Sequence, residues 1–127
     1  MRDNKRGVIM KSLSSFENIY LFRSYVDMRK QINGLAEIIE QTMELNPFFP
    51  SIFVFTGKNR KTLRMIYWDK TGFAAWYKRL EEDRFKWPLH LVGKNISLSL
   101  EEIEWLLKGL DLSKMRPHQE LKYSKIS

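Results

Sequence analysis

Lysine and arginine side chains gather in residues 57–86, and the most direct chemistry open to them is the binding of phosphate groups. This segment carries nine basic and four acidic residues, a net charge of +5, whereas residues 31–56 carry three glutamates and no base. A concentrated positive surface binds polyanions because it displaces their condensed counterions. Solubility of a small domain is the ordinary alternative explanation for such cations. The charge pattern leaves both explanations open.

The stretch GKNRKT, residues 57–62, is the part of this segment best suited to grip a nucleic-acid backbone. Its three cations stand in a polar connection with turn-forming residues, where they can contact phosphates but cannot read base sequence alone. Further cations follow on and after the strands expected downstream. The predicted nucleic-acid-binding residues are Lys58, Arg60, Lys61, Arg64, Lys78, Arg79 and Arg84.

Aromatic rings alternate with these cations, as in Trp76-Tyr77-Lys78-Arg79. Rings stack on bases while cations meet phosphates, so this mixture suits nucleic acid. Large aromatics are equally ordinary cross-strand partners whose surfaces lysine stems cover. No helix-turn-helix or zinc-finger signature accompanies them.

Catalytic chemistry has little support, and we expect no enzyme, no cofactor and no metal site. The chain has no cysteine, and its two histidines, His90 and His118, stand far apart in the sequence. The phosphate-loop spacing of nucleotide-binding enzymes is absent. Carboxylates could still hold Mg²⁺ in a cryptic nuclease, which is the least favoured alternative. The candidates are Asp27, Asp69, Glu81, Glu82 and Asp83.

The length of 127 residues fits one domain, and the net charge is +7. The absence of cysteine fits a reducing cytoplasm, and no run approaches the roughly 18 apolar residues of a membrane span. We predict a cytoplasmic protein with a flexible leader over 1–18, a single domain over 19–112 and a basic, frayed tail over 113–127. Met10 offers a second possible start.

A strand over 19–23 and a long helix over 28–44 are expected first. Asp27 is predicted to cap the helix, whose apolar stripe then faces a sheet. Asn46-Pro47 ends it, because the residue before proline leaves the helical region. The stripe consists of Met28, Ile32, Leu35, Ala36, Ile39 and Met43.

An antiparallel β-meander is expected next. It comprises a central strand over 51–56, a strand over 63–68, the turn DKTG, a return strand over 73–80 and a short edge strand over 84–87. Every second side chain shares a face, so Met65 and Ile66 are expected on opposite faces.

A closing helix follows, with Ser99 and Glu102 forming a capping box. The predicted fold is α+β: one N-terminal helix packed on a small, mostly antiparallel meander sheet, closed by a C-terminal helix.

Three segments, VDMRKQINGL, FVFTGKNRKTLRMIYWDKTGFAAWYKRLE and RFKWP, occur in this order and resemble a known family. This is the small accessory protein TnpB, encoded by the second open reading frame of IS66-type insertion sequences and distinct from the RNA-guided nuclease of that name. The resemblance runs from about Tyr20 to Leu110. It implies a role in transposition beside a separate transposase, and it implies no catalytic residue.

Arg29 and Lys30 match the family pattern. A structural role in exposed ion pairs explains their presence poorly, because such pairs contribute little to the stability of a fold. We therefore predict that they bind a partner. Glu82-Asp83 depart from the pattern, since the family often has a glycine-containing turn there. This departure makes the tip acidic and places any anion site elsewhere.

The leading interpretation is a non-catalytic accessory factor in transposition that binds DNA, the transposase or both through a basic meander surface. Contact with DNA is expected to be weak and sequence-tolerant, and no membrane partner is expected. A protein-interaction module whose cations meet an acidic transposase surface is the first alternative.

Overall fold

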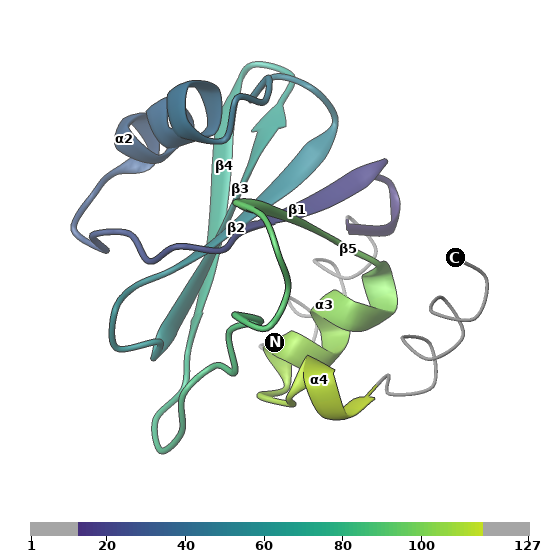
Figure 1. Cartoon of the computed structure of the whole chain (residues 1–127). Helices are drawn as coiled ribbons and strands as arrows, with labels where there is room; N and C mark the ends of the chain where they lie inside the picture. Colours follow the sequence, from purple (N-terminus) through teal and green to yellow (C-terminus); the bar gives the residue numbers. More distant parts are fainter. Residues whose placement is uncertain (1–12, 116–127) are drawn as a thin grey trace, which may run out of the picture.

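A five-stranded sheet forms the centre of the molecule (Figure 1). The computed structural model describes residues 13–115. The strands lie in the order β4-β3-β2-β1-β5, and only β1 and β2 run parallel. Their bounds are β1 Asn18–Phe22, β2 Ser51–Thr56, β3 Thr62–Asp69, β4 Gly72–Arg79 and β5 Asn95–Leu98. The α+β class is confirmed, but the predicted meander describes only β2, β3 and β4, because β1 turns the sheet into a mixed one.

Helical structure connects the two parallel strands, as a parallel pair requires a crossover. It begins as α2, Ile32–Glu37, and continues as a π-helical turn η1, Ile38–Thr42. The backbone N–H of Met43 donates to the carbonyl of Ile38 at 2.9 Å, a bond to the fifth residue back. Leu35, Ile39 and Met43 are buried, as the stripe predicted.

The predicted start of this helix at residue 28 is wrong. Gln31 precedes the first helical residue and makes no side-chain cap. Asp27 instead lies in a separate turn, where its Oδ1 accepts the backbone N–H of Arg29 at 2.9 Å. The physical reason lies in the sheet, because Val26 donates its N–H to the Thr56 carbonyl and holds this part of the chain beside the end of β2.

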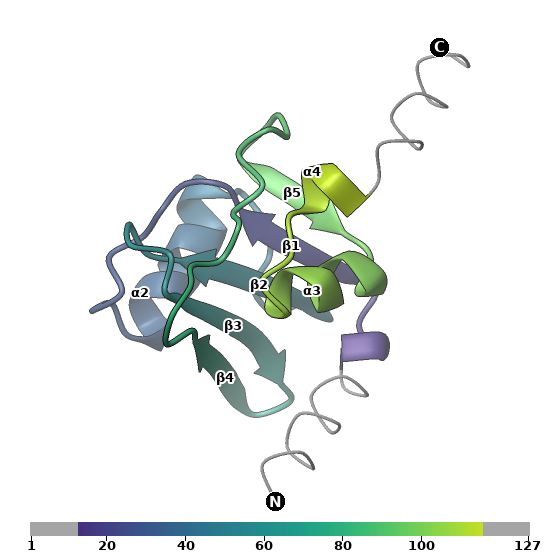
Figure 2. The ribbon, with the colours of Figure 1, turned by 90° about the horizontal axis from the view of Figure 1, so that it is seen from below.

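Two cores lie on opposite faces of the sheet, which makes three layers. The face covered by α2 buries Phe53, Phe55 and Ile66. The other face buries Val54 and Met65 beneath α3 and α4, and Figure 2 shows α2 and α3 on opposite sides of the strands. The predicted alternation along β3 is therefore confirmed. All six residues of β2 are buried, as expected of a central strand.

The closing helix α3, Leu100–Leu107, is confirmed together with its capping box. The Glu102 N–H donates to Ser99 Oγ at 3.1 Å, and the Ser99 N–H donates to Glu102 Oε1 at 2.9 Å. A short helix α4, Leu112–Met115, follows. Within residues 13–115, no helix has the length and apolar character to cross a bilayer.

The predicted edge strand over 84–87 is wrong, and β5 was not predicted. Aromatic residues at alternate positions resemble a strand, but Phe85 and Trp87 insert into the core from an irregular segment. The indole Nε1 of Trp87 donates to the Phe22 carbonyl at 3.0 Å. The outer position beside β1 is taken by β5, whose Ile96 and Leu98 are buried.

Replacing Ser99 with alanine should lower the free energy of unfolding by about 1 kcal/mol, because the helix start loses its side-chain acceptor and the capping box is broken. Urea denaturation monitored by circular dichroism measures this change. Glu102→Gln is the matched control, since glutamine retains an acceptor for the Ser99 N–H. Equal stability of Ser99→Ala and the wild type would contradict a contribution from this cap.

Candidate functional site

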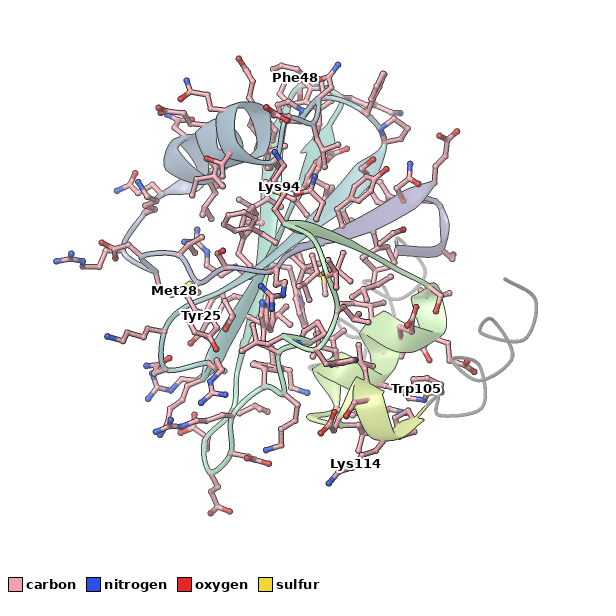
Figure 3. All side chains as sticks on the ribbon, viewed as in Figure 1. Tyr25, Met28, Phe48, Lys94, Trp105 and Lys114 are labelled. Atoms are coloured by element: carbon pink, nitrogen blue, oxygen red, sulfur yellow. The ribbon has the colours of Figure 1, made fainter. Side chains whose placement is uncertain are left out.

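The parallel pairing of β1 and β2 places their carboxyl ends at one end of the sheet, where β3 begins and β4 ends. Segments 23–30, 57–64 and 78–86 run through this region, which we call the basic end. They contain eleven Lys or Arg residues and four Asp or Glu residues. In Figure 3, nitrogen-bearing side chains gather around and below the labelled Tyr25 and Met28. Most of the predicted cations therefore share one region.

Hydrogen bonds to backbone carbonyls hold the three segments together. The Leu80 N–H donates to the Lys61 carbonyl at 2.8 Å, and the Phe85 N–H donates to the Arg60 carbonyl at 2.7 Å. Arg64 Nη1 donates to the Lys30 carbonyl at 2.6 Å. The cations are thus presented by backbone that is fixed by long-range contacts.

The loop between β2 and β3 approaches the Asp27 turn closely. Gly57 has no side chain, and a Cβ at this position would overlap Cγ of Met28. Lys58 then projects from the loop as an exposed cation beside a hollow of about 390 Å³ that Asp27 and Met28 also line. Glycine is needed here because the two loops touch.

Six cations of the basic end are exposed, Lys30 and Lys86 among them. Lys58, Arg79 and Arg84 are exposed, and the side chain of Arg29 is 91% exposed. Arg79 approaches Glu81 only to 3.9 Å, with both side chains largely in solvent, so this pair neutralises little.

The remaining predicted cations are partly engaged by the fold. Lys78 lies on the α3 face, where its Nζ donates to the Leu107 carbonyl at 2.9 Å. A cation is favourable at this helix end because the helix carboxyl terminus is partially negative. Arg60 is half-buried with a φ of 58°, and Lys61 is also half-buried. The structure thus separates Lys78 from the cations exposed at the basic end.

Arg29 and Asp27 form a two-pronged ion pair. Arg29 Nε donates to Oδ1 at 3.0 Å and Nη2 donates to Oδ2 at 2.8 Å. The Arg29 guanidinium, and secondarily its backbone N–H, lowers the pKa of Asp27 from 3.8 to about 2. Asp27 therefore offsets part of the Arg29 charge, while Lys30 beside it is exposed.

The carboxylates considered for a metal do not converge. Asp27 belongs to the basic end and Asp69 to the opposite end of β3. In the part of the chain that the structure describes, no three Asp, Glu or His side chains group to hold a metal ion. Asp83 accepts the Arg84 N–H and Lys86 Nζ, which lower its pKa. His90 is exposed, and His118 lies outside the described residues.

Two cations of the basic end were not predicted from the sequence. Arg23 directly follows β1 and donates from Nη2 to the Leu89 carbonyl at 2.6 Å. Lys86 pairs with Asp83 at 3.0 Å. The parallel pairing of β1 would have revealed Arg23, but sequence periodicity does not specify strand partners.

The family of IS66 Orf2-like proteins matches residues 17–117 of the chain. The chain belongs to this family. Two relatives from Sinorhizobium fredii (strain NBRC 101917 / NGR234), the uncharacterized proteins y4hO and y4jC, are 32% and 35% identical to it. The alignments cover 73% and 72% of this chain and 80% and 77% of the relatives. No solved structure matches the chain.

Membership in the IS66 Orf2-like family links the chain to the transposition of insertion sequences. The resemblance noted from the sequence is confirmed. Its piece DMRK lies in the basic end and its pieces YKRLE and RFKWP overlap it, whereas YWD lies at the opposite end of the β3–β4 hairpin. The family motif thus converges on the region that presents the cations.

Replacing Arg29 with glutamine should raise the pKa of Asp27 from about 2 toward 3.8, because the guanidinium hydrogen bonds are its largest cause. A lowered folded-state pKa stabilises the fold above pH 3.8, and this contribution disappears as the pH falls toward 2. Carboxyl titration by NMR measures the pKa directly. Lys30→Gln is the control and should leave Asp27 nearly unchanged. An unaltered Asp27 pKa in Arg29→Gln would refute the assigned cause.

Proposed function

We propose that this protein is a non-catalytic accessory factor in insertion-sequence transposition that binds the DNA backbone through its basic end. The observation that carries the proposal is the convergence of three distant segments that present exposed cations on fixed backbone. Fixed cations bind phosphates with a smaller ordering cost than cations on mobile chains.

The exposed surface of β4 suits a nucleic acid as well. Tyr77 is 70% exposed, stands opposite Arg64 on β3, and shares its face with Arg79. An exposed ring beside the exposed Arg79 can stack on a base or sugar while the arginine meets a phosphate. Because the remaining cations lie on loops, we expect binding to tolerate many sequences.

The acidic tip formed by Glu81, Glu82 and Asp83 favours a second candidate function. These exposed carboxylates border the basic end and would repel phosphates that come near them. A protein-interaction module, with the cations meeting an acidic surface of the transposase, would tolerate mixed charge more readily. Under this candidate, the isolated protein binds no DNA.

DNA affinity should fall steeply with salt, and removal of exposed cations should reduce this dependence. In the triple variant Lys58→Ala, Arg79→Ala and Arg84→Ala, the slope of log K against log salt should flatten by about 0.9 for each phosphate that the protein no longer neutralises. Fluorescence anisotropy with duplex DNA from the end of the insertion sequence, measured from low to moderate salt, gives these slopes.

A matched control removes the same charge elsewhere, through Lys70→Ala, Lys108→Ala and Lys114→Ala, three exposed lysines outside the basic end. This variant should keep the wild-type slope. Equal slopes for the two triple variants would mean that total charge, rather than the basic end, determines binding. No binding by the wild type at low salt would refute DNA contact, and loss of transposase binding in the basic-end variant would then support the second candidate.

A further inference from the structure

The opposite end of the molecule exposes an aromatic cluster that the proposed DNA contact does not use. Phe48 is 53% exposed and Phe49 is 62% exposed, in the loop that leads into β2. Trp68 and Phe73, a cross-strand pair beside the β3–β4 turn, complete the group. We call these four residues the aromatic end, and Figure 3 shows Phe48 far from Tyr25 and Met28. Adjacent exposed phenylalanines are costly in water unless a partner covers them.

The loop holds these phenylalanines in a defined conformation. Asn46 Oδ1 accepts the Phe48 N–H at 2.9 Å, and the Phe49 carbonyl accepts the Ser51 N–H at 2.7 Å. Prolines 47 and 50 flank the pair and fix two backbone angles. The outward placement of the rings is therefore built into the backbone, which reduces the ordering cost of binding.

Three of the four rings, those of Phe48, Trp68 and Phe73, also support one another. Phe48 and Trp68 meet edge to face, with centroids 4.9 Å apart, and Trp68 meets Phe73 in the same way at 5.0 Å. The ring centroids of Phe48 and Phe73 are 5.6 Å apart. Such packing fixes the position of Phe48 while more than half of its surface stays in solvent.

Two carboxylates border this apolar surface on the side of the helical segment. A hollow of about 460 Å³ is lined by Phe48 and Phe73 together with Glu37 and Glu40, and no basic residue of the described chain lines it. Lys70 lies in the neighbouring turn beside Asp69. Aromatic faces and carboxylates both attract ammonium and guanidinium groups, whereas carboxylates repel phosphates.

We propose that the aromatic end docks a protein segment that carries Lys or Arg beside apolar side chains, and that the transposase of the same insertion sequence supplies this segment. The choice of the transposase rests on the proposed function, whereas the chemistry of the segment follows from the site. Because the two ends of the sheet carry opposite charge, DNA and the transposase can occupy the protein together. The chain would then connect the transposase to DNA.

Binding of the purified transposase to the immobilised full chain, measured without DNA by biolayer interferometry, tests this proposal. The double variant Phe48→Ala and Phe49→Ala should bind at least about tenfold more weakly, as expected for central aromatic anchors. Val92→Ala with Leu110→Ala is the matched control, two exposed apolar side chains outside both the aromatic end and the basic end, and should bind like the wild type.

A second variant tests the charge and leaves every ring in place. Glu37→Lys with Glu40→Lys should also weaken transposase binding about tenfold or more, whereas Glu81→Lys with Glu82→Lys, the same charge change at the basic end, should not. Both variants alter exposed side chains, and thermal melting checks that they fold. Weaker binding in both test variants, with both controls unchanged, supports the proposal.

Several results would overturn it. These are no transposase binding by the wild type, equal binding by the test variants and their controls, or a DNA affinity that falls in the aromatic variant. A dimer that dissociates in that variant would assign the surface to a second copy of the chain. DNA binding through the basic end is measured separately, so the two proposals can fail independently.

Discussion

The parallel pairing of β1 with β2 is the constraint on which the rest of the structure depends. The two strands pair from Asn18 opposite Ser51 to Leu21 opposite Val54, at the centre of the sheet. Since neighbouring parallel strands cannot be joined by a tight turn, the chain between them must cross a face, and α2 and η1 provide that crossing. The same pairing brings both carboxyl ends to the basic end.

The irregular segment after β4 stabilises the basic end through two buried aromatic side chains. Phe85 is fully buried, and Trp87 both packs in the core and donates a hydrogen bond to the last residue of β1. These aromatics link the loop of Arg60 to the end of β1 through backbone and side-chain contacts. Burial of these large rings stabilises the segment and offsets the repulsion among the exposed cations. This explains how the basic end keeps a single conformation despite its many like charges.

Positive and negative side chains lie toward opposite ends of the central strands. Cations dominate where β2 ends, and glutamates with exposed rings border the loop where β2 begins. Such a separation suits the two ends to partners of opposite charge, because each end repels what the other attracts. The two ends suit the DNA and transposase contacts proposed above for a member of a family linked to transposition.

The sequence by itself determined the elements whose signals are local. Ser99 and Glu102 specify the start of α3, DKTG specifies the β3–β4 turn, and alternation assigns the faces of β3, because each rests on neighbours within a few residues. The family membership and the basic character of residues 57–86 were also evident from the sequence.

Tertiary structure alone decided that Asp27 pairs with Arg29 instead of capping a helix, that RFKW enters the core instead of forming a strand, and that Lys78 faces α3. These outcomes depend on which strand pairs with β1 and on which backbone groups there still lack a hydrogen-bond partner. The periodicity of a sequence does not specify contacts between residues that are distant in the chain.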